Sequence, residues 1–173
     1  MGTLTVDNLN VNSTLTAASG VGKVLQVQSA FKSDTASTAS TSDVAISGLS
    51  LTLTPASTSS KVLVQFDVGT MGNNHNAHMF FTPYRSIGGG SYSAIGLGTG
   101  GSSYNYAAAA YHSNTVYGTV GHCFLDSPNT TSEITYKLYF RSSSGSYTMY
   151  INRRGSDDLF RGSTSLICTE IGG

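Results

Sequence analysis

The pattern of apolar and polar residues in the last third of the chain predicts a series of β-strands. Three apolar runs lie within residues 116–126, 132–142 and 147–154, a fourth closes the chain at 163–171, and Ser-, Gly- and Asn-rich turns separate them. The second run alternates strictly, which is typical of a strand with one buried face. The residues predicted to be buried there are Ile134, Tyr136, Leu138 and Phe140, and those predicted to face outward are Thr135, Lys137, Tyr139 and Arg141.

Residues 23–97 continue the same pattern. Strands are predicted at 23–31, 43–46, 49–55, 61–68 and 78–87, with a short one near 91–97. In the first of these, Leu25, Val27 and Phe31 share one face, and Gln26, Gln28 and Ala30 share the other. Pro83 predicts an edge strand or a bulge. A single helical turn is the alternative for the four alanines at 107–110. The alternating apolar sets are Leu49, Leu51 and Leu53, and then Val62, Val64, Phe66 and Val68.

The first twenty residues differ from the rest of the chain. Leu4, Val6, Leu9 and Val11 are scattered among Thr, Asn and Asp, and a small-residue hinge follows. A segment this short forms no core of its own, so these side chains need another surface to cover them. We therefore expect residues 1–20 to be an extended N-terminal arm and hinge, and residues 21–173 to be one domain. Packing of the arm on its own domain is the alternative.

The composition favours a folded all-β protein over a disordered chain. Charged residues are only 10% of the sequence, but 10 Tyr and 7 Phe stand in the alternating runs, whereas disordered chains are poor in aromatic residues. A length of 173 residues suits one domain. The fold class expected is an antiparallel, jelly-roll-like β-sandwich with a short extended N-terminal arm.

Charge argues against a nucleic-acid partner. The formal net charge is +0, and no stripe of Lys and Arg supplies the electrostatics that such binding needs. There is no secretion signal at the start and no apolar run long enough to span a bilayer, so we expect synthesis in a cytosol and no membrane partner. Cys123 and Cys168 are expected to be reduced and buried, although a bridge between them is conceivable.

Several longer stretches together resemble a β-sandwich module of tailed-phage virions. The stretches are VGKVLQVQS, GLSLTLTPASTSSKVLVQFDV, FLDSPNTTSEITYKLYFRSSSGSYTMYINR and RGSTSLICTEI, so that the resemblance covers about residues 21–171. Such modules occur at the ends of tail fibres and as knobs on the particle surface, and they are generally trimeric. The resemblance therefore implies a homotrimer on a virion surface, made in the host cytoplasm, and it carries over no catalytic residue.

Two roles fit this resemblance. A sandwich with an extended arm resembles a capsid decoration (cement) protein, whose arm adds a strand to the major capsid protein or lies in a groove of it. The capsid-contact residues would then be Leu4, Val6, Leu9 and Val11. The alternative is a tail-fibre or receptor-binding knob that recognises a host surface glycan.

Residue patterns that suggest chemistry are weak. His75 and His78 have no Cys or carboxylate nearby to complete a metal site, the Gly-rich run at 96–101 is not followed by a helix, and Asp157 and Asp158 are adjacent, so they point in opposite directions on an extended chain. No GxSxG motif is present. We expect no enzymatic activity, no cofactor and no metal.

Tyrosines on the long polar segment between residues 87 and 114 are the feature that favours binding. Tyr rings beside amides suit the recognition of sugars or proteins. The same rings can instead cover a subunit interface. The candidate ligand or interface residues are Tyr92, Tyr104, Tyr106, Tyr111 and His112.

Overall fold

The computed structural model describes residues 22–73, 77–100, 105–112, 118–155, 157 and 159–173. These residues form two antiparallel sheets packed face to face, and none of them is helical. The all-β fold and the antiparallel β-sandwich predicted from the sequence are confirmed. The arm at 1–20 lies outside the described residues.

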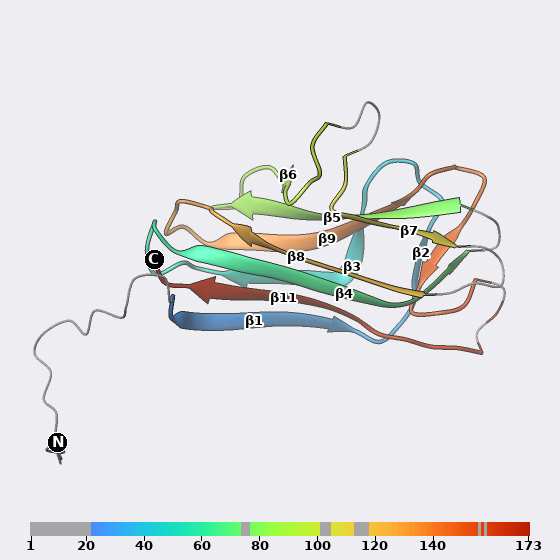
Figure 1. The fold of residues 1–173 in the computed structure, drawn as a ribbon, viewed down its shortest axis with the longest axis horizontal. Helices are drawn as coiled ribbons and strands as arrows, with labels where there is room; N and C mark the ends of the chain where they lie inside the picture. Colours follow the sequence, from blue (N-terminus) through green and yellow to red (C-terminus); the bar gives the residue numbers. More distant parts are fainter. Residues whose placement is uncertain (1–21, 74–76, 101–104, 113–117, 156, 158) are drawn as a thin grey trace, which may run out of the picture.

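Sheet A contains strands from both ends of the described chain. Its order is β1-β11-β4-β8. Beyond the ends of β11 and β1, the short strands β10 and β2 take the corresponding places in the sheet, where β10 pairs with β4 and β2 pairs with β10. The bounds are β1 Val24–Lys32, β2 Ala36–Thr38, β4 Lys61–Asn73, β8 Gly118–Asp126, β10 Met149–Ile151 and β11 Thr164–Ile171. β1, β11 and β4 lie side by side in Figure 1.

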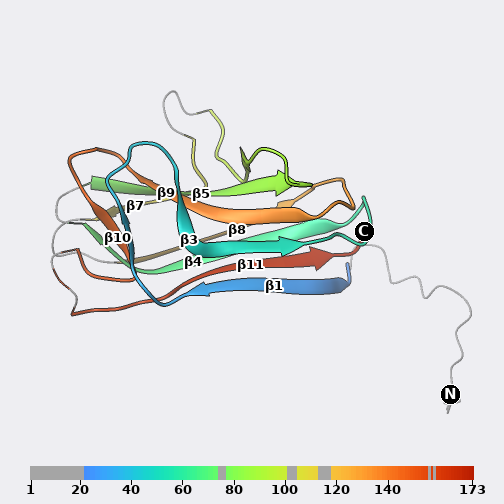
Figure 2. The same cartoon turned by 180° about the vertical axis from the view of Figure 1, so that it is seen from behind.

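Sheet B has the order β3-β9-β5, and β5 pairs on its far side with β7 over one half and with β6 over the other. The bounds are β3 Val44–Leu53, β5 Ala77–Ile87, β6 Ser93–Ala94, β7 Ala108–His112 and β9 Ile134–Ser142. β3 lies behind β4 in Figure 1 and in front of it in Figure 2. Along the sides of the sandwich, β1 lies beside β3, and β7 beside β8.

The core between the sheets consists of the alternating side chains that the sequence pattern selects. The two leucine and valine sets of residues 49–53 and 62–68 are buried, as are the four predicted inward residues of β9. The largest fully buried side chains include Tyr136, Phe66, Phe81 and Phe140. Period-two alternation therefore places these strands correctly in the sandwich.

Asn152 links two breaks in sheet A, one between β10 and β11 and the other between β1 and β2. Its backbone is left-handed, with φ 61°, a conformation that Asn tolerates better than most residues. Its buried amide donates to the carbonyl oxygens of Lys32 (3.0 Å) and Asp34 (2.9 Å) and accepts from the hydroxyl of Thr164 (2.8 Å). One side chain thus satisfies backbone groups that the interrupted ladder leaves without a strand partner.

Pro83 lies within β5 and is paired with Leu138 of β9. On its other side the neighbour changes, because pairing with β7 ends at Phe81 and pairing with β6 starts at Tyr84. At Pro83 itself neither strand pairs with β5, so the missing N–H breaks no ladder bond, while the Pro83 carbonyl accepts from Ile95 N at 3.0 Å. β5 has neighbours on both sides, and its register with β9 runs through Pro83 without a bulge, so Pro83 marks a change of neighbour rather than the predicted edge strand or bulge.

Two expectations about local structure are wrong. The alanine run forms no helical turn, since Ala108 begins β7. Cys123 is exposed rather than buried, because it points outward from β8, whereas Cys168 is buried on the inner side of β11; both thiols are free.

Candidate functional site

The predicted tyrosines separate into three groups. Tyr92 and Tyr106 are described in full. Tyr104 lies outside the described residues. Tyr111 and His112 belong to β7, where their backbones pair with His78 and Ala77, but their side chains are not described.

The outer side of sheet B carries an aromatic face, formed by Phe80, Tyr84, Tyr92, Tyr106 and Tyr139. Alternation along β5 and β9 turns three of these rings away from the core. Tyr106, from the segment before β7, stacks on Phe80 with ring centroids 4.3 Å apart, and the rings of Tyr84 and Tyr139 are 4.1 Å apart. Tyr106, one of the predicted loop tyrosines, therefore extends a cluster that begins on the sheet.

Two cations lie against this aromatic face. The guanidinium of Arg141 is 4.9 Å from the ring centroid of Phe80, and the ammonium of Lys137 is 4.5 Å from that of Tyr92. Both contacts have the geometry of cation–π interactions. A hydrogen bond with Tyr92 raises the pKa of Lys137, so this ammonium keeps its charge.

Asp43 supplies a carboxylate at the same face. The hydroxyl of Tyr84 donates to Asp43 Oδ2 at 2.7 Å, and Arg141 Nε lies 3.5 Å from Asp43 Oδ1. Burial, and then the bond to Asp43, raise the pKa of Tyr84 to about 12, so its hydroxyl stays a donor at neutral pH. Rings, cations and a carboxylate together suit recognition by stacking and hydrogen bonding.

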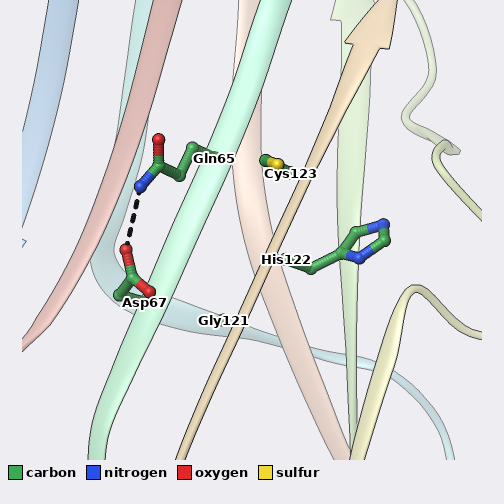
Figure 3. Close-up of a pocket in the computed structure, with 5 residues that line it drawn as sticks. All are labelled: Gln65, Asp67, Gly121, His122 and Cys123. Atoms are coloured by element: carbon green, nitrogen blue, oxygen red, sulfur yellow. Dashed lines mark hydrogen bonds between the residues drawn. The ribbon is translucent and has the colours of Figure 1, made fainter.

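A shallow depression of about 420 Å³ lies on sheet A, lined by Gln65, Asp67, Gly121, His122 and Cys123. Figure 3 shows the Gln65 amide donating to Asp67, at 3.1 Å, while His122 points away from both. Gly121 leaves room for the carboxylate, because a Cβ at this position would lie 2.4 Å from Asp67 Oδ1.

The depression does not form a thiol–imidazole pair. Cys123 and His122 are neighbours on β8 and point to opposite sides of the sheet. The imidazole packs inside, with its centroid 6.1 Å from that of Phe66 and 5.9 Å from that of Phe124. Within the described part of the chain, no three His, Cys, Asp or Glu side chains converge on a point where a metal ion would fit.

The sequence reasoning missed Phe80, the stacking partner of Tyr106, and the Tyr84–Tyr139 pair on the same face. A signal was present for Tyr139, because the alternation of residues 134–141 places it outward with Lys137 and Arg141. No comparable signal pairs Phe80 with Tyr106, since that contact depends on the path of the segment between β6 and β7.

No family model and no curated protein matches this chain. Among solved structures, it is similar to a chain from the structure of infectious bursal disease virus, Gx strain, with a TM-score of 0.42 and 12% sequence identity. The alignment covers 97% of this chain but only 44% of the viral chain. A similarity this low carries no argument about function. In the described residues, no helix is long and apolar enough to cross a membrane.

Proposed function

We propose that this chain is a non-enzymatic virion structural protein: a homotrimeric decoration protein on the outside of a phage capsid. Its N-terminal arm anchors it to the major capsid protein. The sequence resemblance of residues 21–171 to virion surface modules supports the virion role, and the scattered apolar residues of the arm support the anchor. Catalysis is not part of the proposal.

The observation that carries the anchor is where the arm joins the sandwich. Gly172 N donates to the carbonyl of Lys23 at 2.8 Å, so the arm joins beside the end of β11. β11 starts at the opposite end, where residues 159–163 lead into it. An arm held by a capsid would therefore point the loop at 159–163 away from the particle.

Burial of the four apolar side chains alone would not hold such an arm. Each buried apolar side chain contributes roughly 1.5–3 kcal/mol of transfer free energy. Ordering an extended backbone costs about 1–2 kcal/mol per residue. Main-chain pairing to a sheet edge would have to supply much of the remainder, which suits a Thr- and Val-rich segment.

The test is attachment to capsids that lack this protein. Deletion of residues 1–16 is expected to leave the melting temperature nearly unchanged and to abolish co-sedimentation with the capsids. Leu9→Asp with Val11→Asp should act in the same way, because a charge placed in that contact has no partner. The matched control is Asn8→Asp with Asn10→Asp, which adds the same charge at polar positions. Full occupancy by the deletion variant would refute the anchor.

The aromatic face favours a second candidate, a tail-fibre knob that binds a host glycan. Tyr92 is 36% exposed and lies under the Lys137 ammonium, so it offers a ring and a donor to a sugar. A glycan array with the full chain tests this function, and Tyr92→Ala should remove the signal. Retention of glycan binding by Tyr92→Ala would place the ligand elsewhere.

A further inference from the structure

The outer side of sheet A exposes an apolar surface that crosses four strands. Thr164, Leu166, Cys168 and Glu170 of β11 point into the sandwich, so the residues between them point outward. The registers with β1, β4 and β8 extend this alternation over the whole sheet. We call this surface the outer face of sheet A; its apolar members are Val24, Val27, Phe31, Leu63, Leu125, Ile167 and Ile171.

Four of these side chains are highly exposed, whereas Leu63, Ile167 and Ile171 are half-buried. Phe31 is 68% exposed, Val24 62%, Val27 56% and Leu125 54%. Isolated exposed apolar residues need no explanation, but four on the same side of one sheet mark an interaction surface. No described element lies over this side of sheet A in Figure 1.

The two ends of this face differ in a complementary way. At one end, the register places Val24 beside Ile171, and Ile171 beside Lys61. Six residues further along β4, about 20 Å away, the outward residue is Asp67. Phe31 is in the same row as Asp67.

Consider a twofold axis that lies in the plane of the sheet and runs perpendicular to its strands. Rotation by 180° about this axis places the Lys61 end of one copy opposite the Asp67 end of the other. With a second copy turned in this way, Lys61 faces Asp67 of the other copy at both ends of β4. Val24 then faces Phe31, which is an apolar contact. Between them, Leu125 faces Cys123, Val27 faces Ser29 and Leu63 faces Gln65.

The size of the face also suits a pair of copies. Four strands about 4.8 Å apart and eight residues at about 3.3 Å each give a projected area on the order of 500 Å². The accessible area of protruding side chains is larger than the projection. It therefore approaches the roughly 600–1,000 Å² per partner of standard interfaces.

We propose that the outer face of sheet A binds the same face of a second copy of this chain, with the two β4 strands antiparallel. The Lys61–Asp67 pairs fix the orientation, and the apolar side chains supply the contact. This pairing is independent of the capsid role. An isologous face closes at two copies, so it forms a dimer, or a pair of trimers where three copies also associate through another surface.

The first test is light scattering of the full chain during size exclusion. The wild type is expected to elute at an even multiple of 18.0 kDa. Val27→Glu should halve that mass, since the substitution enters the interface twice, while its melting profile shows a folded subunit. Leu159→Glu is the matched control, because Leu159 is an exposed apolar residue of the loop after β10 and should leave the mass unchanged.

The second test concerns orientation and does not depend on Val27. Lys61→Glu and Asp67→Lys should each weaken pairing at least 10-fold in dilution series, and the double exchange should restore it. A wild type at 18.0 kDa at micromolar concentration overturns the proposal, as does a double exchange that fails to recover pairing. If Val27→Glu reduced capsid attachment without changing the mass, the outer face of sheet A would bind the capsid instead. That result would also overturn the pairing proposal.

Discussion

The hydroxyl of Tyr136 donates a 2.8 Å hydrogen bond to Oδ2 of Asp126, and this bond joins the two sheets. Tyr136 is the fully buried central ring of β9 in sheet B, and Asp126 ends β8 in sheet A. Arg85 of β5 completes the group, with Nη1 at 2.6 and 2.8 Å from the two carboxylate oxygens. Burial, and then the charge of Asp126, raise the pKa of the Tyr136 phenol, so it remains a donor.

Removal of this hydroxyl is expected to destabilise the sandwich measurably. Tyr136→Phe should lower the free energy of unfolding by about 1.5–3 kcal/mol, the range for a hydrogen bond to a charged group. Asp126→Ala should cost more, about 3–5 kcal/mol, because it leaves Arg85 with an uncompensated, largely buried charge. Urea unfolding of both variants checks this. Tyr139→Phe, on the aromatic face of sheet B, is the control, and an equal loss of unfolding free energy in that variant would contradict the account.

Glu170 predicts how stability depends on pH. Its buried carboxylate accepts from Gln26 Nε2 and from the Ala56 amide, each at 2.7 Å. Burial acts to raise its pKa, but these bonds outweigh burial and hold the pKa below its ordinary value of 4.5. A lowered folded pKa stabilises the fold above the unfolded pKa, and this contribution is lost as pH falls through the folded value.

Thermal melting between neutral pH and pH 3 measures this contribution. The wild type should lose stability as the pH falls below about 4.5. Glu170→Gln should be less stable at neutral pH and show a flatter profile. The lowered pKa values of Asp34 and Asp157, held by Lys32 and Arg154, remain in both proteins and cancel in the comparison. Parallel profiles for the two proteins would show that Glu170 makes no such contribution.

Asn152 is expected to be among the most sensitive polar positions. Asn152→Ala removes three buried hydrogen bonds and places Ala in a left-handed backbone, so the free energy of unfolding should fall by about 2–4 kcal/mol. Asn152→Gly should recover roughly 1 kcal/mol of this, because glycine accepts the backbone conformation. Asn129 has a similar φ of 53° but is exposed. Asn129→Gly should therefore be close to neutral, and chemical denaturation compares all three.

The strands could be predicted from the sequence because apolar and polar residues alternate wherever a strand buries only one face. Residues 134–140 illustrate this, since every inward residue predicted there is buried. The same pattern could not tell which side of β1 faces the core. The apolar side, with Val27 and Phe31, is exposed, because Gln26 and Ala30 occupy the inner positions and Gln26 binds buried Glu170.

The candidate site was predictable only in part, for a related reason. The loop tyrosines were visible as a composition signal, but Phe80, which stacks on Tyr106, and Tyr84 lie on a strand whose outward side depends on the sheet register. The outer face of sheet A was invisible for the same reason, since its members come from four strands that are distant in sequence. Register and tertiary pairing, rather than local propensity, determine both surfaces.

The most direct test of the central claim is the amount of this protein in purified virus particles, measured by quantitative mass spectrometry against the major capsid protein. The account predicts a copy number of the same order as that of the major capsid protein, and a copy number that falls sharply when residues 1–16 are deleted. A ratio matching the tail proteins would indicate a fibre knob instead. Absence of the chain from intact particles would contradict a structural role in the virion.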